Sequence, residues 1–260
     1  MDGQPPQMQS TDDGIKTKLA AMRTSLIDQD VPLQGIDDAM LARFLRARAM
    51  HVPRAAKMLA EHQRWRASFV PLGFISESEV ESELAQGKVS LQGVSKKTGH
   101  PLLIMLARHH VANKADPQEF KRFVVYVFDK LIASGASGDV EQHIVIVDLE
   151  GVGYKNMDVK SLLTALHICQ NYYPERLVRL YFVKAPSIFS SFWKMASPFL
   201  DKVTREKIIF LDANKTIDFL LKEFDVDIIP KEYGGKAELI LIQDACVQNW
   251  LQTNSSSSSV

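Results

Sequence analysis

His143-Ile144-Val145-Ile146-Val147-Asp148 is the stretch of sequence that decides the fold of this 260-residue chain. Its four central residues are all aliphatic, so a strand here is apolar on both faces, as in the interior of a parallel sheet. Three further apolar runs of strand length occur at residues 102–106, 177–183 and 208–211, and the last is also apolar on both faces. These runs predict the strands of one sheet.

Segments with helical periodicity separate the strand-like runs. Residues 120–131 carry apolar side chains at helical spacing before His143, and residues 162–169 do so after Asp148. An order of strand, helix, strand and helix predicts an α/β fold with a largely parallel sheet, right-handed crossovers and helices packed on it. Residues 93–98, which contain two lysines, lack the second glycine of a phosphate-binding loop and are more typical of a hairpin turn.

The first part of the chain is purely helical in character. Leu41, Phe44 and Leu45 recur at helical spacing after the capping pair at residues 37–38, and a second helix starts at Pro53. The pattern changes between residues 70 and 88. We therefore expect an N-terminal helical module over residues 15–75 and an α/β domain over residues 76–240.

The two ends of the chain are polar. We expect a disordered N-terminus over residues 1–14, which contain Pro5 and Pro6, and a C-terminal extension over residues 241–260 that ends in a disordered serine tail. The start lacks the layout of a signal peptide, and no apolar run approaches the ~18 residues of a membrane span. Cys169 and Cys246 are too few for a disulfide framework, which favours a reducing, cytoplasmic location.

Charge and motifs exclude several classes of function. The chain has 31 Lys and Arg against 31 Asp and Glu, without the basic surplus typical of nucleic-acid binding. His109 and His110 are adjacent, so in a strand they would point to opposite faces and would not share a metal. Gly151-Val152-Gly153 has Asn156 where a dinucleotide loop needs glycine, and no Gly-x-Ser-x-Gly elbow is present. We predict no enzyme activity, no metal and no cofactor.

Residues 187–200 form a predicted helix of unusual composition. Its aromatic face consists of Phe189, Phe192, Trp193 and Phe199. Periodicity alone favours a helix buried in the core. The alternative is a mobile lid over an apolar cavity, with aromatic side chains that dip into a bilayer interface. Pro186 and Pro198 bracket the helix, which makes hinge motion plausible.

A second feature is the polar corner Tyr172-Tyr173-Pro174-Glu175-Arg176. The preceding helix must stop at Pro174, and charged residues at such a corner are usually solvated. Further along, Thr204 is a candidate cap of a short turn and Lys207 a candidate exposed residue, both just before the strand-like run at 208–211. From the residue pattern alone, these positions are surface positions.

Five motifs in a fixed order carry a resemblance to a known family. They are Phe44-Leu45-Arg46-Ala47-Arg48, Asn171-Tyr172-Tyr173-Pro174-Glu175-Arg176, Ala185-Pro186, Pro198-Phe199-Leu200-Asp201 and Tyr233-Gly234-Gly235. Together they resemble the CRAL-TRIO lipid-binding family, and most closely the phosphatidylinositol transfer proteins of yeast and plants. The resemblance implies a small helical module followed by a mixed α/β domain that encloses one lipid in an apolar pocket. It also implies that residues 187–200 gate lipid exchange.

The resemblance further implies roles for individual residues. Glu175 and Lys207 match the pair that holds the inositol phosphate headgroup, and Arg48, Arg176 and Thr204 match supporting positions. Inositol hydroxyls donate hydrogen bonds to a carboxylate, whereas the phosphodiester needs a cation. An apolar cavity would hold the acyl chains, because burying each CH₂ contributes ~0.8 kcal/mol. The implied ligand is phosphatidylinositol, bound as cargo.

The sequence departs from the family at positions that face phosphatidylcholine in some members. His143 and Val145 stand where hydroxyl side chains are expected, and Gln92 and Leu103 stand where tyrosines are expected. These departures argue against phosphatidylcholine as a second ligand. In the family, a lysine often follows the arginine that Arg48 matches. Ala49 stands at that position here, so one supporting charge is missing.

We therefore expect a non-enzymatic, monomeric carrier that binds phosphatidylinositol and transfers it between membranes or presents it to lipid kinases. Because no polybasic tract anchors a chain of zero net charge, its contact with membranes should be transient. One alternative is a carrier of another hydrophobic ligand, such as a sterol, a tocopherol-like molecule or another phospholipid. The other is a protein-interaction module with a vestigial pocket.

Overall fold

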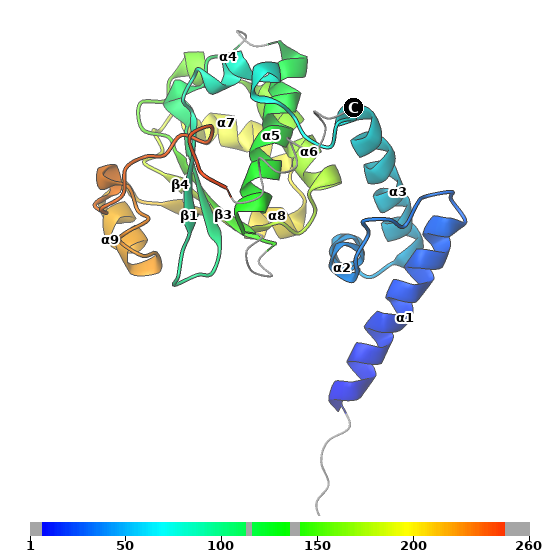
Figure 1. Ribbon diagram of the computed structural model, residues 1–260. Coiled ribbons are helices and arrows are strands. Elements are labelled where there is room, and N and C mark those ends of the chain that lie inside the picture. The colour runs from blue at the N-terminus through cyan, green and yellow to red at the C-terminus, as the bar shows by residue number, and fades with distance from the viewer. Residues whose placement is uncertain (1–6, 113–115, 136–140, 248–260) are drawn as a thin grey trace, which may run out of the picture. The chain divides into compact units, whose positions relative to one another are not determined.

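The chain divides into a helical unit, Met1–Gly73, and an α/β unit, Phe74–Val260 (Figure 1). The computed structural model describes residues 7–112, 116–135 and 141–247. The division falls within the stretch from residue 70 to residue 88, where the sequence changes from purely helical to alternating.

Three helices make up the helical unit. They are α1 (Gln7–Ile27), α2 (Asp38–Ala47) and α3 (Val52–Phe69). Asp37 caps α2, because its carboxylate accepts the Met40 N–H at 2.7 Å. Pro53 lies in the first turn of α3, where its missing N–H leaves no helical hydrogen bond unmade. The fully buried side chains of this unit include Met22, Leu26, Leu41, Leu45 and Leu59.

Residues 7–14, for which the composition predicts disorder, form the first turns of α1 in the structure. A polar composition does not by itself exclude a helix. Gly14 costs only ~1 kcal/mol relative to alanine inside a helix, and no proline follows Pro6 before Ile27. Residues 1–6 lie outside the described part of the chain.

A five-stranded sheet in the order β1-β2-β3-β4-β5 forms the centre of the α/β unit. The strands are β1 (Val89–Val94), β2 (Pro101–Leu106), β3 (His143–Asp148), β4 (Leu177–Val183) and β5 (Ile208–Leu211). β2 to β5 are parallel, whereas β1 pairs with β2 in the antiparallel sense. The predicted α/β class, the largely parallel sheet and the hairpin turn before β2 are confirmed. β1 was not predicted, because Ser90, Gln92 and Gly93 interrupt its apolar character.

Helices cover both faces of the sheet (Figure 1). The longer ones are α5 (Pro117–Gly135), α6 (Val159–Tyr172) and α9 (Ala213–Glu223). The short ones are α4 (Glu81–Leu84), α7 (Phe189–Ala196) and α8 (Lys202–Glu206). Single 3₁₀ turns occur at Glu77–Glu79, Ala107–His109, Tyr154–Asn156, Ser197–Phe199 and Lys231–Tyr233.

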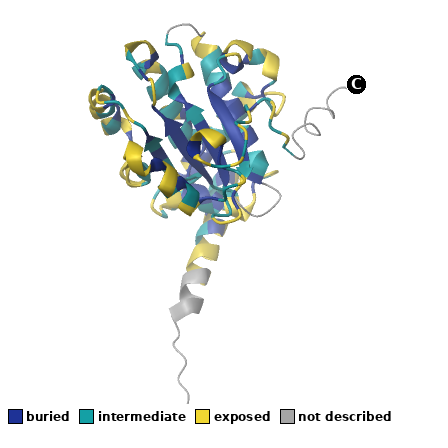
Figure 2. Ribbon diagram, turned by 90° about the vertical axis from the view of Figure 1, so that its left-hand side faces the viewer, coloured by how far each residue is buried: buried dark blue, intermediate teal, exposed yellow. Residues whose placement is uncertain are grey.

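Alternate residues of the strands divide between two packing layers. On one face Ile144, Ile146 and Tyr181 pack with Leu220 of α9 and with Phe224, which follows this helix. On the other face the residues between them point toward the layer of α5, α6 and α7, because side chains alternate along a strand. Figure 2 shows the buried residues concentrated in the sheet and in the helix surfaces that pack on it.

Two chain segments approach each other closely on the side of the sheet that carries α9. Gly235 lies so near Ile229 that an added Cβ would be 1.8 Å from the Ile229 carbonyl oxygen. Gly234 has φ +81°, a left-handed conformation that favours glycine. Backbone geometry at this contact therefore requires both glycines of the Tyr233-Gly234-Gly235 motif.

The last strand departs from the prediction of a strand buried on both faces. β5 lies at one edge of the sheet, and none of its four residues is fully buried. Phe210 is 46% exposed. An edge strand has a neighbour on one side only, and the apolar run does not reveal this position.

The segment after residue 239 covers the opposite edge of the sheet. The Leu91 N–H donates to the Ile240 carbonyl at 2.9 Å, and the Ile242 N–H donates to the Val89 carbonyl at 3.0 Å. Lys130 of α5 donates to the Gln243 carbonyl at 3.1 Å. The first part of the expected C-terminal extension therefore belongs to the sheet, whereas the serine tail lies outside the described residues. Over the described ranges, no helix is long and apolar enough to cross a bilayer.

Candidate functional site

The amino ends of β3, β4 and β5 gather the polar residues singled out in the sequence. Parallel strands begin at the same edge of a sheet, so residues just before each strand become neighbours. The His143 N–H donates to the Arg176 carbonyl at 2.8 Å, and the Leu180 N–H donates to the Lys207 carbonyl at 3.0 Å. These bonds bring the corner at 172–176 and the turn before β5 to one place.

Glu175 and Lys207 form an ion pair at this edge. The Lys207 Nζ lies 3.6 Å from Glu175 Oε2, and the two side chains are 19% and 22% exposed. Glu175 has φ +59°, a conformation that is uncommon for a residue with a side chain. Gln142 holds the corner by donating to the Glu175 carbonyl at 3.1 Å. Backbone strain of this kind concentrates at functional sites.

Thr204 lies in the same turn as Lys207 but is not a helix cap. Asp201 caps α8 instead, accepting the Thr204 N–H at 2.8 Å and the Thr204 hydroxyl at 2.6 Å. The Thr204 carbonyl accepts the Lys207 N–H at 3.1 Å. Thr204 therefore shapes the turn that places Lys207, and its hydroxyl proton is already engaged.

The other two predicted headgroup residues are placed differently. Arg176 adjoins Glu175, but its guanidinium donates to the Glu141 carbonyl at 2.9 Å and lies 3.7 Å from the Glu141 carboxylate. Arg48 belongs to the helical unit, where its guanidinium donates to the Ala47 carbonyl at 3.0 Å. The structure thus brings Glu175, Lys207 and Thr204 together, with Arg176 beside them.

His143 is buried next to the Glu175–Lys207 pair. Its side chain is 1% exposed, and its ring centroid lies 5.5 Å from that of Phe128. Burial, followed by the nearby charges of Arg176, His100 and Lys207, lowers the pKa of His143 to about 3. The imidazole is therefore neutral at physiological pH, and its Nδ1 has no hydrogen-bond partner within the described residues. From the sequence, His143 was predicted to start a strand and to depart from a family pattern, but not to lie at the site.

Apolar side chains adjoin the polar edge on the face that carries α6 and α7. Leu162, Leu163 and Leu166 of α6 are half-buried, as are Leu180 and Phe182 of β4. In α6 only Ile168 is fully buried. An apolar helix that leaves most of its apolar residues half-buried next to a sheet offers a surface on which hydrocarbon chains can pack.

The predicted aromatic helix consists of α7 followed by a 3₁₀ turn, a change that coincides with Pro198. Phe189 is buried, and Trp193 packs edge-on against Phe182 and Phe210 with ring centroids at 5.5 and 5.3 Å. Phe192 is half-buried, and its ring centroid lies 5.7 Å from that of Phe189.

The far side of this helix is exposed. Met195 and Phe199 are 51% and 57% exposed, and Val203 of the following helix α8 is 52% exposed. The predicted gate residues therefore divide into two sets: Phe189 and Trp193 pack on the sheet, whereas Phe199 faces outward. The inward side of the segment matches the core-helix interpretation, and the outward side matches the lid interpretation.

Other buried charges form a second polar cluster. Lys88 forms an ion pair with Glu83, and its Nζ lies 3.3 Å from His110 Nδ1. Burial, as the largest cause, lowers the pKa of both Lys88 and His110. The expectation that His109 and His110 lie in a strand is wrong, since His109 ends a 3₁₀ turn and His110 follows it. Among the described residues no group of three or more His, Cys, Asp or Glu is arranged to hold a metal.

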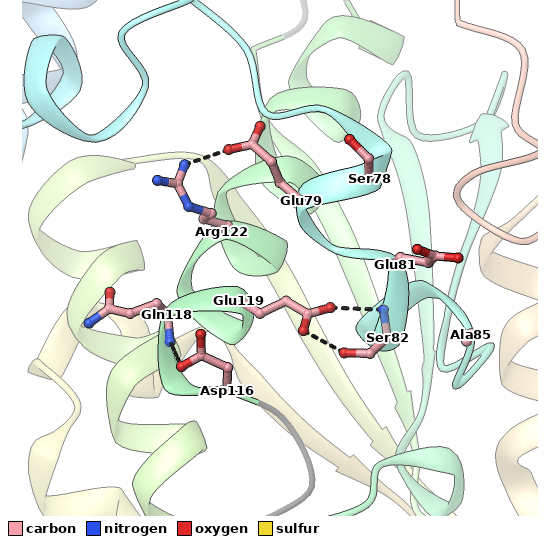
Figure 3. Close-up of a pocket in the computed structure, with 9 residues that line it drawn as sticks. All are labelled: Ser78, Glu79, Glu81, Ser82, Ala85, Asp116, Gln118, Glu119 and Arg122. Atoms are coloured by element: carbon pink, nitrogen blue, oxygen red, sulfur yellow. Dashed lines mark hydrogen bonds and ion pairs between the residues drawn. The ribbon is translucent and has the colours of Figure 1, made fainter.

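A pocket of about 630 Å³ lies elsewhere, between α4 and the start of α5 (Figure 3). Its lining is polar: Glu119 accepts the Ser82 N–H at 2.8 Å, and Arg122 lies 2.8 Å from Glu79. These contacts cap α4 and tie it to α5. The pocket contains none of the predicted headgroup or gate residues, and its polar walls do not suit acyl chains.

Comparisons with known proteins identify the class to which this architecture belongs. Residues 84–235 match the CRAL/TRIO domain, and residues 16–61 match the CRAL/TRIO N-terminal domain. The chain therefore belongs to the CRAL/TRIO family. The expected resemblance is confirmed over both units.

The relatives include proteins of yeasts and a plant. The Sec14 cytosolic factor of Schizosaccharomyces pombe is 30% identical over 220 residues, which cover 79% of this chain and 77% of that protein. A phosphatidylinositol/phosphatidylcholine transfer protein of Arabidopsis thaliana, SFH7, is 29% identical over 81% of this chain and 41% of its own length. A crystal structure of Sfh5 has a TM-score of 0.58 at 24% identity, covering 77% of this chain and 80% of that one, which shows a shared fold.

Proposed function

We propose that this protein is a non-enzymatic carrier that binds one phosphatidylinositol molecule, and that it transfers the lipid between membranes or presents it to lipid kinases. The observation that carries the proposal is the Glu175–Lys207 pair, half-buried at the amino edge of the parallel strands. A carboxylate and an ammonium 3.6 Å apart offer an acceptor for inositol hydroxyls and a counter-charge for the phosphodiester.

The apolar surface next to the pair suits the rest of such a ligand. Half-buried side chains of α6 and β4 continue from the polar edge into the layer between helices and sheet. Hydrocarbon chains placed there gain about 25 cal/mol for each Å² removed from water. In this proposal the turns at the sheet edge recognise the headgroup, and α6 and β4 bury the acyl chains.

The names of several relatives are consistent with this proposal. One is a phosphatidylinositol/phosphatidylcholine transfer protein, and several others are Sec14 cytosolic factors. For this chain the buried neutral His143 and the aliphatic Val145 offer no hydroxyl where the choline lipid would need one, so we propose phosphatidylinositol alone. The structure also turns Gln92 away from this region, since its amide lies between the Glu238 carbonyl and the Ile240 N–H, 3.0 Å from each.

Membrane contact in this proposal uses the exposed side of the gate. Met195, Phe199 and Val203 are the outward apolar residues, and Lys194 and Lys202 lie beside them in sequence. Apolar side chains enter the interface while the cations remain near the phosphates. The contact is transient, because the apolar area is small.

The test is native mass spectrometry with lipid extraction on the full chain purified from cells. We expect phosphatidylinositol in the wild type and its loss in the double variant Glu175→Ala, Lys207→Ala. A control variant removes a different, exposed ion pair, Asp227→Ala with Lys236→Ala, whose charged atoms are 3.8 Å apart. A different hydrophobic ligand in all three proteins would refute headgroup recognition. No bound lipid and no uptake from vesicles would favour an interaction module.

A further inference from the structure

The zero net charge of the chain hides an uneven distribution of charge. Residues 39–69, which include most of α2 and all of α3, contain seven Arg or Lys and a single acidic residue, Glu61, for a net charge of +6. The remaining residues therefore carry a compensating surplus of negative charge. A count over the whole sequence misses this partition.

Several of the seven cations are engaged inside the helical unit. Arg43 is buried, and Arg64 and Arg66 donate to the carbonyls of Gln29 and Gly73. The remaining four lie on either side of the turn between α2 and α3. They are Arg46, Arg48, Arg54 and Lys57.

Three of these four cations are exposed at the turn, and we call Arg46, Arg54 and Lys57 the basic elbow. No ion pair joins Arg46 or Arg54 to a carboxylate within the described residues, and Lys57 meets Glu61 only at 3.9 Å. Such exposed i,i+4 pairs contribute only about 0.3–0.5 kcal/mol. Asp38 lies at the other end of α2 and is paired with Arg23 at 2.7 Å.

The tip of the basic elbow is the turn at residues 49–53, and the backbone presents it outward. Ala49 and Met50 both have positive φ, at +49° and +61°, so the chain reverses direction within a few residues. Ala49, His51 and Pro53 are exposed, while Val52 is half-buried. The exposed tip therefore carries two small apolar residues and one imidazole, and cations flank it on both helices.

We propose that the basic elbow is a docking surface for the anionic face of a membrane. Anionic lipids attract juxtamembrane Lys and Arg residues, and small apolar side chains enter the interface beside them. The apolar residues of the tip favour a bilayer over a nucleic acid, because single-stranded nucleic-acid sites rely on aromatic stacking platforms and the tip carries no Phe, Tyr or Trp. This inference goes beyond the proposed function and is independent of which lipid the α/β unit carries.

The test measures partitioning of the full chain onto phosphatidylcholine vesicles with and without one third phosphatidylserine. Each basic residue contributes about 1 kcal/mol at such a surface, so Arg46→Gln, Arg54→Gln and Lys57→Gln together should weaken partitioning on the order of a hundredfold. A control variant with Lys155, Lys215 and Lys222 changed to Gln removes the same net charge from exposed positions of the α/β unit. We expect less than a threefold effect from the control.

Two further measurements keep the proposal refutable if the triple variant folds poorly. Arg46→Lys with Arg54→Lys retains the charge and should retain binding, and wild-type binding should fall steeply toward 1 M salt, where the Debye length is ~3 Å. The proposal would be overturned if the elbow and control variants lost binding equally, or if binding did not depend on salt. Tighter binding to a single-stranded oligonucleotide than to the anionic vesicles would also overturn it. Phosphatidylinositol extracted from the triple variant should be unchanged, which separates this inference from failure of the lipid site.

Discussion

The buried His143 makes the stability of the α/β unit depend on pH, and the size of the effect follows from its environment. Its pKa is about 3 in the folded protein, because burial and the charges of Arg176, His100 and Lys207 disfavour the imidazolium. In the unfolded chain the pKa is about 6.5. The unfolded state therefore binds the proton first, so the contribution of His143 is complete above pH 6.5 and is lost as the pH falls toward 3.

The slope in this window is about 1.36 kcal/mol per pH unit, so His143 alone should remove about 2 kcal/mol between pH 7.5 and pH 5. The assay is urea unfolding at both pH values for the wild type and for His143→Leu, which cannot be protonated. We expect the wild type to lose about 2 kcal/mol more than the variant. Other groups, including His110 with its lowered pKa, titrate in both proteins and cancel in the comparison.

A titration of the histidine resonances by NMR supplies a direct check. The His143 resonance should not shift between pH 7.5 and pH 5, and Lys207→Met should raise its pKa by removing one of the repelling charges. If the two proteins lose stability equally, or if His143 titrates near pH 6.5, then the imidazole is solvated in the folded state. Either result would refute the reasoning.

Three further predictions rest on other contacts. Phe199→Asp changes an exposed side chain, so it should shift the unfolding midpoint little but slow phosphatidylinositol transfer between vesicles, and parallel losses would contradict the outward role of Phe199. Tyr233→Phe should cost about 1–3 kcal/mol in urea unfolding, because the phenol donates at 2.6 Å to Asp148, which is 1% exposed; an unchanged midpoint would contradict this. Gly235→Ala should abolish soluble expression, whereas Gly153→Ala, with open space around its Cβ position, should express normally.

Local pattern was sufficient to predict much of the fold. The strands β2, β3 and β4 and the helices α2, α3, α5 and α6 were predicted because their periodicity or their apolar runs depend on near neighbours in sequence. β1 and the edge position of β5 were missed. Whether a strand lies at the centre or at an edge depends on which strands pair with it. The residues of the strand itself do not reveal these partners.

The candidate site was predicted in part. The resemblance supplied Glu175 and Lys207, and the structure places them 3.6 Å apart. The engagement of Arg176 by Glu141 and the isolation of the His143 imidazole were not predictable, because both depend on packing between segments distant in sequence. The basic elbow was also missed, since net charge was counted over the whole chain.

By itself, the sequence determined the order of helices and strands, the caps such as Asp37, and the family, because these depend on local spacing and on motifs read along the chain. Only the tertiary structure decided which charged groups meet. Parallel pairing carries the start of β4 next to the start of β5, and with them Glu175 next to Lys207. Hydrogen bonds between strands set that neighbourhood, and no feature of either segment alone contains it.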